Sequence, residues 1–210
     1  MEDFVIKVIL VGECSVGKTS FITRYCDKDR IDDFYTPTIG VDLKVSRHEV
    51  EGKKMKCHIW DTAGQDNFET IVTTYFKGVG AVICMFDITQ PSTLTKAETW
   101  VRKVKAHNSA EVLPVLLLAN KIDRQHEIRT ASEAKKMADR NGWLYGEVSA
   151  RSSLNVDRVF NDLVEEVYYN VIKKDIQSPG IKIAGSNDKI RLLAKKAEDE
   201  NKVFKCCTIS

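Results

Sequence analysis

The stretch that most restricts what this chain can fold into is Gly12-Glu13-Cys14-Ser15-Val16-Gly17-Lys18-Thr19. It fits the pattern GxxxxGKS or GxxxxGKT, and it lies between an apolar run and a helical pattern. The glycines allow a tight turn, so that successive backbone N–H groups and the start of the helix face an anion. The lysine adds a positive charge, and the hydroxyl of Thr19 can bind Mg²⁺. The motif therefore predicts a loop that holds the phosphates of a nucleotide.

Apolar runs at regular intervals predict the strands of the fold. Four runs are bounded by Gly, Asp or Asn and have the character of buried strands, at residues 4–11, 55–60, 81–86 and 112–119. A short strand is expected near residues 143–148. Residues 41–50 and 53–60 flank Glu51-Gly52 and predict a hairpin, which adds one antiparallel edge strand.

Amphipathic stretches between these runs predict helices. They lie at residues 92–107, 130–141 and 156–167, and in the last of them apolar residues recur at helical spacing from Val156 to Val167. Alternation of strands and helices favours a parallel sheet with helices on both faces. We therefore expect an α/β fold with a mostly parallel six-stranded sheet and one antiparallel edge strand.

The composition is that of an ordinary globular protein. The chain has 210 residues, of which 43% are hydrophobic and 30% charged, and this suits one domain with an appendage. Its apolar runs are far shorter than the roughly 18 residues that span a bilayer, so no transmembrane segment is expected. The residues before the first apolar run are acidic rather than basic, so we expect no secretory signal and a cytosolic location.

Charge and cysteine patterns exclude two further classes of protein. Residues 171–205 carry nine Lys or Arg against five Asp or Glu, a net +4, whereas the rest of the chain carries −2. A nucleic-acid-binding protein would need a basic face on its body, so no nucleic-acid partner is expected. No CxxC pair is present, so a structural zinc site is not expected either.

Polar residues follow two further predicted strands. Asp61 comes directly after the run at 55–60, and at the carboxyl edge of a parallel sheet it can face the magnesium ion that Thr19 holds. Asn120 and Asp123 follow the run at 112–119. An amide and a carboxylate together match a base that offers two N–H donors beside an acceptor, which favours guanine over adenine.

Five motifs in register make the chain similar to the Ras superfamily of small GTPases, and within it to the Rab branch, over about residues 4–172. They are Gly12 to Thr19, Thr38, Asp61 to Gln65, Asn120 to Asp123, and Ser149-Ala150-Arg151. The Rab character comes from Ile39-Gly40-Val41-Asp42, Ile59 to Gln65, Tyr75-Phe76-Lys77-Gly78 and Phe86-Asp87-Ile88-Thr89. The resemblance implies a P-loop NTPase fold of the small G-domain type that binds GTP or GDP with Mg²⁺.

The resemblance also implies which residues bind the metal ion and which serve catalysis. Thr19 and Thr38 would bind Mg²⁺, with Asp61 acting through water. Lys18 would hold the phosphates and serve catalysis, and Gln65 would orient the attacking water. Hydrolysis by such an enzyme is slow until an activating partner supplies an arginine.

Residues from all five motifs would hold the nucleotide. Asp123 would bind the N1 and N2 protons of guanine, Ala150 would offer its N–H to O6, and Lys121 would lie over the ring. The set implied for the nucleotide is Glu13, Cys14, Ser15, Val16, Gly17, Lys18, Thr19, Ser20, Tyr35, Thr38, Gly64, Asn120, Lys121, Asp123, Ser149, Ala150 and Arg151.

Several residues differ from the usual pattern of the family: Cys14, Ser15, Ile31, Leu43, Asp66, Asn67 and Arg151. Cys14 is either a modifiable thiol near the γ-phosphate or a tolerated small side chain. Leu43 replaces a phenylalanine of the aromatic cluster that, with Trp60 and Tyr75, meets effectors. The choice of partners is therefore expected to be unusual.

The chain is expected to divide into a GTPase domain at residues 1–174 and a flexible, basic tail at residues 175–210. The tail ends Cys206-Cys207-Thr208-Ile209-Ser210, and tandem cysteines at the end of a Rab-like chain imply prenylation. Lipid on Cys206 and Cys207 would anchor the protein to the cytosolic face of endomembranes, with a soluble cytosolic pool.

The leading hypothesis is a Rab-like GTP/GDP switch that hydrolyses GTP and recruits effectors in vesicular membrane traffic. The implied partners are an exchange factor, a GTPase-activating protein, effectors at the Ile39–Tyr75 surface, a GDP-dissociation inhibitor and the prenylation machinery. We expect a monomer. The alternatives are a nucleotide-dependent binding module with negligible hydrolysis and an ATP-dependent small-molecule kinase, although a kinase would not need Asn120 to Asp123.

Overall fold

A sheet of seven strands forms the centre of the molecule in the computed structural model, which describes residues 2–27, 40–63, 72–124 and 128–183. The strand order is β2-β3-β1-β4-β5-β6, with β7 paired to β1. The pairs β2–β3 and β1–β7 are antiparallel and the others are parallel. The strands are β1 (Phe4–Val11), β2 (Val41–Val50), β3 (Lys53–Thr62), β4 (Ala81–Asp87), β5 (Val115–Asn120), β6 (Leu144–Glu147) and β7 (Ile181–Ile183).

The helices follow the expected order along the chain. They are α1 (Lys18–Cys26), the 3₁₀ turn η2 (Thr74–Phe76), α3 (Pro91–Thr95), α4 (Ala97–Ala106), α5 (Ile128–Asn141), α6 (Val156–Val167) and the π-helical turn η3 (Tyr168–Ile172). The helix expected over residues 92–107 is divided at Lys96, where α3 ends and α4 begins. No helix in the described ranges is both long and apolar enough to cross a membrane.

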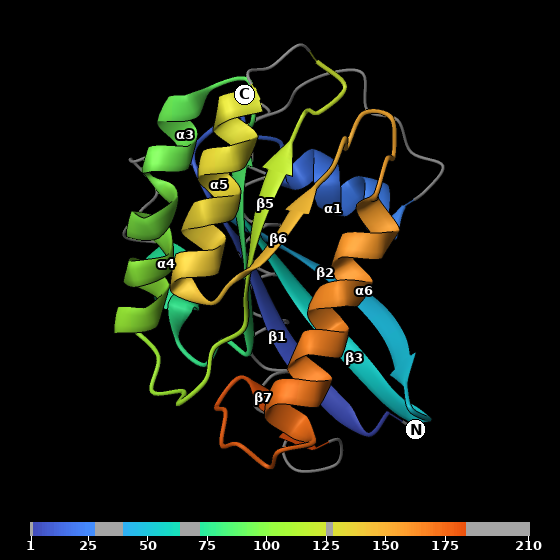
Figure 1. The fold of residues 1–210 in the computed structure, drawn as a ribbon. Coiled ribbons are helices and arrows are strands. Elements are labelled where there is room, and N and C mark those ends of the chain that lie inside the picture. Colours follow the sequence, from blue (N-terminus) through green and yellow to red (C-terminus); the bar gives the residue numbers. More distant parts are fainter. Residues whose placement is uncertain (1, 28–39, 64–71, 125–127, 184–210) are drawn as a thin grey trace, which may run out of the picture.

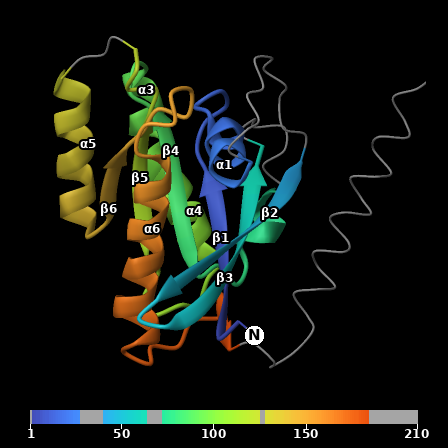
Figure 2. The same ribbon diagram turned by 90° about the vertical axis from the view of Figure 1, so that its right-hand side faces the viewer.

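Alternation along β1 gives the sheet two buried faces, as expected for an α/β fold. Val8 and Leu10 join one apolar cluster with α1 and α6, whereas Ile9 and Val11 join a second with α3, α4 and α5. In Figure 1, α4 and α5 lie to the left of the sheet and α1 and α6 to its right. The view in Figure 2 places α6 in front of the sheet. The expected helices on both faces are confirmed.

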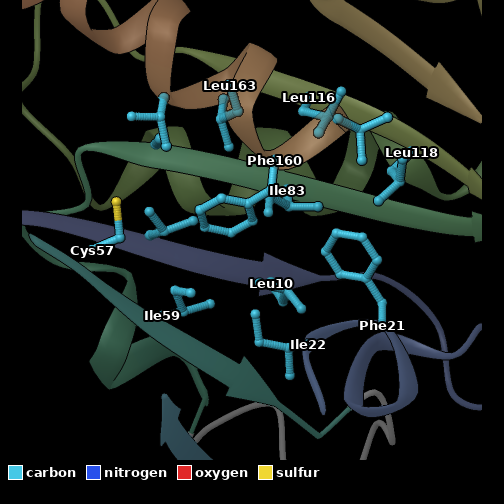
Figure 3. Close-up of a cluster of buried hydrophobic side chains, with 14 of the residues drawn as sticks. Leu10, Phe21, Ile22, Cys57, Ile59, Ile83, Leu116, Leu118, Phe160 and Leu163 are labelled. Carbon is cyan, nitrogen blue, oxygen red and sulfur yellow. The ribbon is translucent and has the colours of Figure 1, made fainter. Parts of the chain in front are cut away.

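The cluster beneath α1 and α6 fixes the helix that follows the phosphate loop. Figure 3 shows Phe21 and Ile22 of α1 beside Leu10, with Phe160 and Leu163 of α6 on the same side of the sheet. All five side chains are at most 1% exposed. The start of α1, where the phosphate loop ends, is thereby held against the end of β1.

The sheet has one strand more than the sequence predicts. Residues from 175 onward were expected to remain off the body, and for residues 175–183 this expectation is wrong because Ile181–Ile183 pair with the start of β1. β4 first pairs with β1 at Val8, so the N–H and C=O groups of Phe4 to Ile6 on that side need another strand. β7 supplies it.

A close backbone contact leads the chain into β7. The N–H of Lys7 donates to the carbonyl of Gly180 at 2.8 Å. A Cβ atom on Gly180 would lie 1.9 Å from the backbone nitrogen of Gly80, so only glycine permits this approach. β7 and β4 therefore pair with successive parts of β1. β7 lies at the end of the sheet opposite the phosphate loop, at the bottom of Figure 1.

Candidate functional site

Two glycines shape the loop between β1 and α1. Gly12 has φ of 139°, and a Cβ atom there would lie 2.2 Å from the carbonyl oxygen of Met85 on β4. Gly17 has φ of 97°, and its Cβ atom would lie 2.3 Å from Nδ2 of Asn120. Both positions combine a left-handed backbone with a close approach, so both require glycine. The loop is thus packed against the ends of two other strands.

Lys18 is the buried cation of this loop. Its side chain is 6% exposed, and its Nζ donates to the carbonyls of Gly12 and Glu13, each at 2.8 Å. Burial lowers the pKa of Lys18, and the nearby Asp61 carboxylate opposes this shift. A buried ammonium that donates to two main-chain carbonyls gains from a nearby anion, so this position suits a phosphate.

Asp61 and Thr19 meet at the edge of the same loop. The Thr19 hydroxyl donates to Oδ2 of Asp61 at 2.6 Å, and Asp61 is 1% exposed. Its other oxygen, Oδ1, is buried and finds no hydrogen-bond partner among the described residues. Burial raises the pKa of Asp61 to about 6, although the Thr19 hydroxyl and the Lys18 charge oppose the rise.

This oxygen set fits Mg²⁺ bound together with a phosphate. Mg²⁺ usually takes one or two carboxylates, waters and substrate phosphates, and here a hydroxyl lies beside a carboxylate oxygen without a partner. The described part of the chain holds no group of three or more His, Cys, Asp or Glu that could hold a metal ion by itself. The Thr19 hydroxyl and the Asp61 carboxylate suit a metal ion whose other ligands are water and phosphate oxygens.

Asn120 joins the phosphate loop to the base side of the site. It is 2% exposed at the end of β5, and its Nδ2 donates to the carbonyl of Val16 at 2.9 Å. Its Oδ1 accepts a hydrogen bond from the N–H of Ala150 at 3.1 Å. In this structure, therefore, the N–H expected to face O6 of guanine is bonded to Asn120. Asn120 thereby fixes the loop after β6 relative to the phosphate loop.

Asp123 and Ser149 form a second contact between these loops. The Ser149 hydroxyl donates to Oδ1 of Asp123 at 2.6 Å and accepts from the N–H of Ser152 at 3.0 Å. Ser149 is fully buried, whereas Asp123 is exposed. A buried hydroxyl therefore orients an exposed carboxylate, which suits a group that receives hydrogen bonds from a ligand.

Lys121 depends on an acidic residue whose role the sequence reasoning did not identify. Its Nζ donates to the carbonyl of Ser15 at 2.7 Å and pairs with Oδ2 of Asp87 at 2.6 Å. Burial favours a higher pKa for Asp87, but hydrogen bonds from Lys121 and Thr89 outweigh it, so the pKa is lowered. The signal in the sequence was an acidic residue at the end of a wholly apolar strand.

The remaining expected residues divide into two groups. Cys14, Ser15, Ser20 and Arg151 are exposed around the loops just described. The other expected nucleotide, metal, catalytic and lipid residues lie outside the described residues, namely Tyr35, Thr38, Gly64, Gln65, Cys206 and Cys207.

The expected cluster of Leu43, Trp60 and Tyr75 is present. The Trp60 and Tyr75 ring centroids lie 5.1 Å apart, and Leu43 packs against the same apolar cluster. Lys7 lies 5.4 Å above the Trp60 ring, and its Nζ donates to the carbonyls of Tyr75 and Lys77, each at 2.7 Å. Burial lowers the pKa of Lys7 to about 8.

Comparison with known proteins finds the same family by two routes. The Ras family pattern matches residues 7–169. The Ras-related protein Rab-13 of Mesocricetus auratus is 35% identical over 205 residues, which cover 97% of this chain and 96% of that protein. Rab-13 of Bos taurus is 38% identical over 166 residues, 79% of this chain and 81% of that protein. The Ras-related protein RABA5c of Arabidopsis thaliana is 31% identical over 209 residues, 99% of this chain and 96% of that protein.

These relatives agree with the geometry of the site. Members of the family bind GTP and GDP with Mg²⁺ and hydrolyse GTP, and a buried lysine beside a hydroxyl and a carboxylate provides the groups that this requires. The chain belongs to the Ras family and is a small GTPase of its Rab branch.

Proposed function

We propose that the described loops perform the residue roles implied by the family pattern. Lys18 and the N–H groups of residues 13–19 hold the β- and γ-phosphates, and Thr19 and Asp61 hold the metal ion, with Thr38. The observation that carries this proposal is the Asp61 carboxylate, which has one oxygen beside the Thr19 hydroxyl and a second, buried oxygen that no other described residue bonds. An unpaired buried oxygen is costly, so a cation at this point would stabilise the folded loop.

The base site follows from the contacts after β5. Asp123 accepts hydrogen bonds from the N1–H and N2–H groups of guanine. Asn120 and Lys121 hold the phosphate loop in place beside the base. Ser149, Ala150 and Arg151 complete this side of the site. In our proposal Tyr35 and Gly64 also face the nucleotide.

Hydrolysis in this class depends on positioning and charge rather than on covalent catalysis. Gln65 orients the attacking water, and Lys18 stabilises charge on the transferred phosphoryl group. A binding module with negligible hydrolysis is not favoured, because the chain keeps a glutamine at position 65.

We further propose a division of the chain into a GTPase body and a tail that carries lipid on Cys206 and Cys207. Two lipid chains give stable membrane attachment, whereas one chain gives marginal attachment. The net charge of residues 171–205, which is +4, adds a weaker attraction to anionic leaflets. The protein then resides on the cytosolic face of endomembranes, with a soluble pool, and acts in vesicular traffic as a monomer.

Rab proteins act with exchange factors, GTPase-activating proteins, effectors and a GDP-dissociation inhibitor. For this chain we propose that effectors bind the surface from Ile39 to Tyr75, where Leu43, Trp60 and Tyr75 gather. Leucine at position 43 has no aromatic ring to stack on a partner, so effectors suited to phenylalanine should bind less tightly.

Competition binding tests the proposed site. Bound fluorescent GDP should be displaced by GTP and not by ATP, because ATP lacks the paired N–H donors that Asp123 recognises. Asp123→Ala should weaken GDP binding by a few kcal/mol, the cost of a lost charged hydrogen-bond pair. Equal displacement by ATP and GTP would overturn the base-site assignment.

A further inference from the structure

The side chain of Glu13 links the phosphate loop to the first turn of α4. Its Oε2 lies 2.6 Å from Nζ of Lys96, the residue before α4, and its Oε1 accepts from Nε1 of Trp100 at 2.9 Å. The two partners are 83 and 87 residues away in sequence. These contacts join two elements that are remote along the chain.

The hydrogen bond between Trp100 and Glu13 is partly buried. Trp100 is 4% exposed and belongs to the apolar cluster beneath α4, and the Glu13 side chain is 19% exposed. Among the described residues, the indole nitrogens of Trp60 and Trp143 are buried without a hydrogen-bond partner. The Trp100 nitrogen, in contrast, has a carboxylate as acceptor, which makes a stronger bond than a neutral acceptor does.

The main chain of Glu13 performs a different task from its side chain. Its carbonyl accepts from Nζ of Lys18 at 2.8 Å. The backbone of Glu13 thus holds the phosphate-binding Lys18, while the side chain of Glu13 is held by Lys96 and Trp100 at the start of α4. The pair with Lys96 also offsets a negative charge that would otherwise disfavour phosphates nearby.

We propose that Glu13 is a positioning residue whose contacts with Trp100 and Lys96 set how long this GTPase retains its nucleotide. The inference rests on nucleotide binding by this loop and assigns a new role to a side chain within it. When the contacts are lost, the Glu13 carbonyl is no longer fixed and Lys18 is less well placed for the phosphates.

Release of fluorescent GDP tests the proposal through a double-mutant cycle. Glu13→Ala and Trp100→Phe should each speed GDP dissociation about tenfold, equivalent to about 1.4 kcal/mol. The double variant should release GDP no faster than the faster single variant, because both changes remove the same contact. Glu13→Gln keeps an acceptor for Trp100 but loses the charge, so its rate should fall between wild type and Glu13→Ala.

Two matched controls separate positioning from stability. Trp143→Phe makes the same chemical change at a tryptophan remote from the loop, and Glu98→Gln removes a carboxylate of α4 that binds Arg140 and Asn141. Both should leave GDP release within twofold of wild type. The thermal midpoint of each nucleotide-free variant should be recorded alongside its rate.

Unchanged GDP release in Trp100→Phe and Glu13→Gln, with or without a lower thermal midpoint, would overturn the positioning role. Because these two substitutions change side-chain size less than Glu13→Ala does, both variants can still be measured if Glu13→Ala does not fold. Additive rates in the double variant would also overturn it. A wild-type protein that fails to retain GDP would instead overturn the proposed nucleotide site, so the two failures are distinguishable.

Discussion

The side-chain amide of Asn120 donates to the main-chain carbonyl of Val16, 2.9 Å away, and so ties the end of β5 to the phosphate loop. The nitrogen of the same amide lies 2.3 Å from where a Cβ atom on Gly17 would be, and the amide oxygen accepts from the N–H of Ala150. One buried side chain therefore sets the spacing between the phosphate side and the base side of the site.

Asn120→Ala should impair both stability and nucleotide retention. The change leaves the Val16 carbonyl and the Ala150 N–H without their partner in a buried place, at a cost of about 1–3 kcal/mol each. We expect a lower thermal midpoint and GDP release at least tenfold faster than wild type. Thermal unfolding and fluorescent GDP release measure both effects. Asn108 is unsuitable as a control, because it is half-buried and also bonds backbone groups.

Asn161→Ala, on the exposed face of α6, provides the matched control, because the Asn161 amide hydrogen-bonds His48 of β2 rather than a loop of the site. It should leave GDP release unchanged and lower the thermal midpoint less than Asn120→Ala does, because its hydrogen bond is at an exposed position. A normal rate of GDP release in Asn120→Ala would contradict the role assigned to Asn120.

The sequence predicts those features of this fold that depend on local pattern. The strands around Leu10 and the hairpin at Glu51-Gly52 come from periodicity and turn chemistry, which act over a few residues. The phosphate loop is equally local, because one run of eight residues contains all its groups.

Features that depend on strand register could not be predicted in this way. Lys121 meets Asp87 because β4 pairs with β5 so that Asp87 lies opposite Asn120. β7 contains three residues, too few for a periodic signal, and it forms because β1 has an unpaired edge beside it. Such contacts arise from the assembled sheet and not from any one segment.

Truncation tests the unexpected strand. A chain of residues 1–183 should unfold at the same temperature as the full chain, whereas residues 1–174 should unfold about 2–8 °C lower. The shorter chain loses the pairing with Phe4 to Ile6 and the packing of Ile181 on the core. Differential scanning calorimetry of GDP-bound samples measures the midpoints.

A point variant supports this test without shortening the chain. Gly180→Ala places a Cβ atom against the backbone of Gly80 and should lower the midpoint as the 1–174 truncation does. Gly142→Ala is the control, because nothing lies within 4 Å of its Cβ position, although its φ of 65° adds a small strain. Equal midpoints for residues 1–174 and 1–183 would show that β7 contributes no stability.

Acid should destabilise the folded protein through His58 on β3. Burial lowers the pKa of His58 to about 4 from an ordinary 6.5, and the charge of Lys56 acts in the same direction. Between these values the unfolded chain binds more protons at His58, so the contribution of His58 to the free energy of unfolding falls as pH drops from about 6.5 to about 4. The ring is only partly buried, so the loss should be at most about 2 kcal/mol.

Urea unfolding at several pH values checks this effect. His58→Gln should reduce the fall in stability between pH 6.5 and 4, while the same substitution at exposed His107 should not. Burial also lowers the pKa of His48, so part of the fall should remain in His58→Gln. An unchanged pH profile in His58→Gln would exclude His58 as the source.

Cell fractionation tests the lipid tail. Removal of residues 206–210 should leave GDP binding and the thermal midpoint unchanged but move the protein from membranes to cytosol, because screened charge alone binds weakly. Single Cys206→Ser and Cys207→Ser variants should show partial association, since one chain anchors marginally. Truncated protein that still sediments with membranes would point to a protein partner as the recruiter.

Phosphate release from GTP tests the central claim most directly. Purified protein loaded with GTP should release phosphate slowly, and a partner's arginine should speed release roughly 10³- to 10⁵-fold. Gln65→Leu should bind GTP as tightly as wild type yet lose the activated reaction, and an equal load of ATP should yield no phosphate. Equal activated release from wild type and Gln65→Leu, or release from ATP as fast as from GTP, would contradict the account.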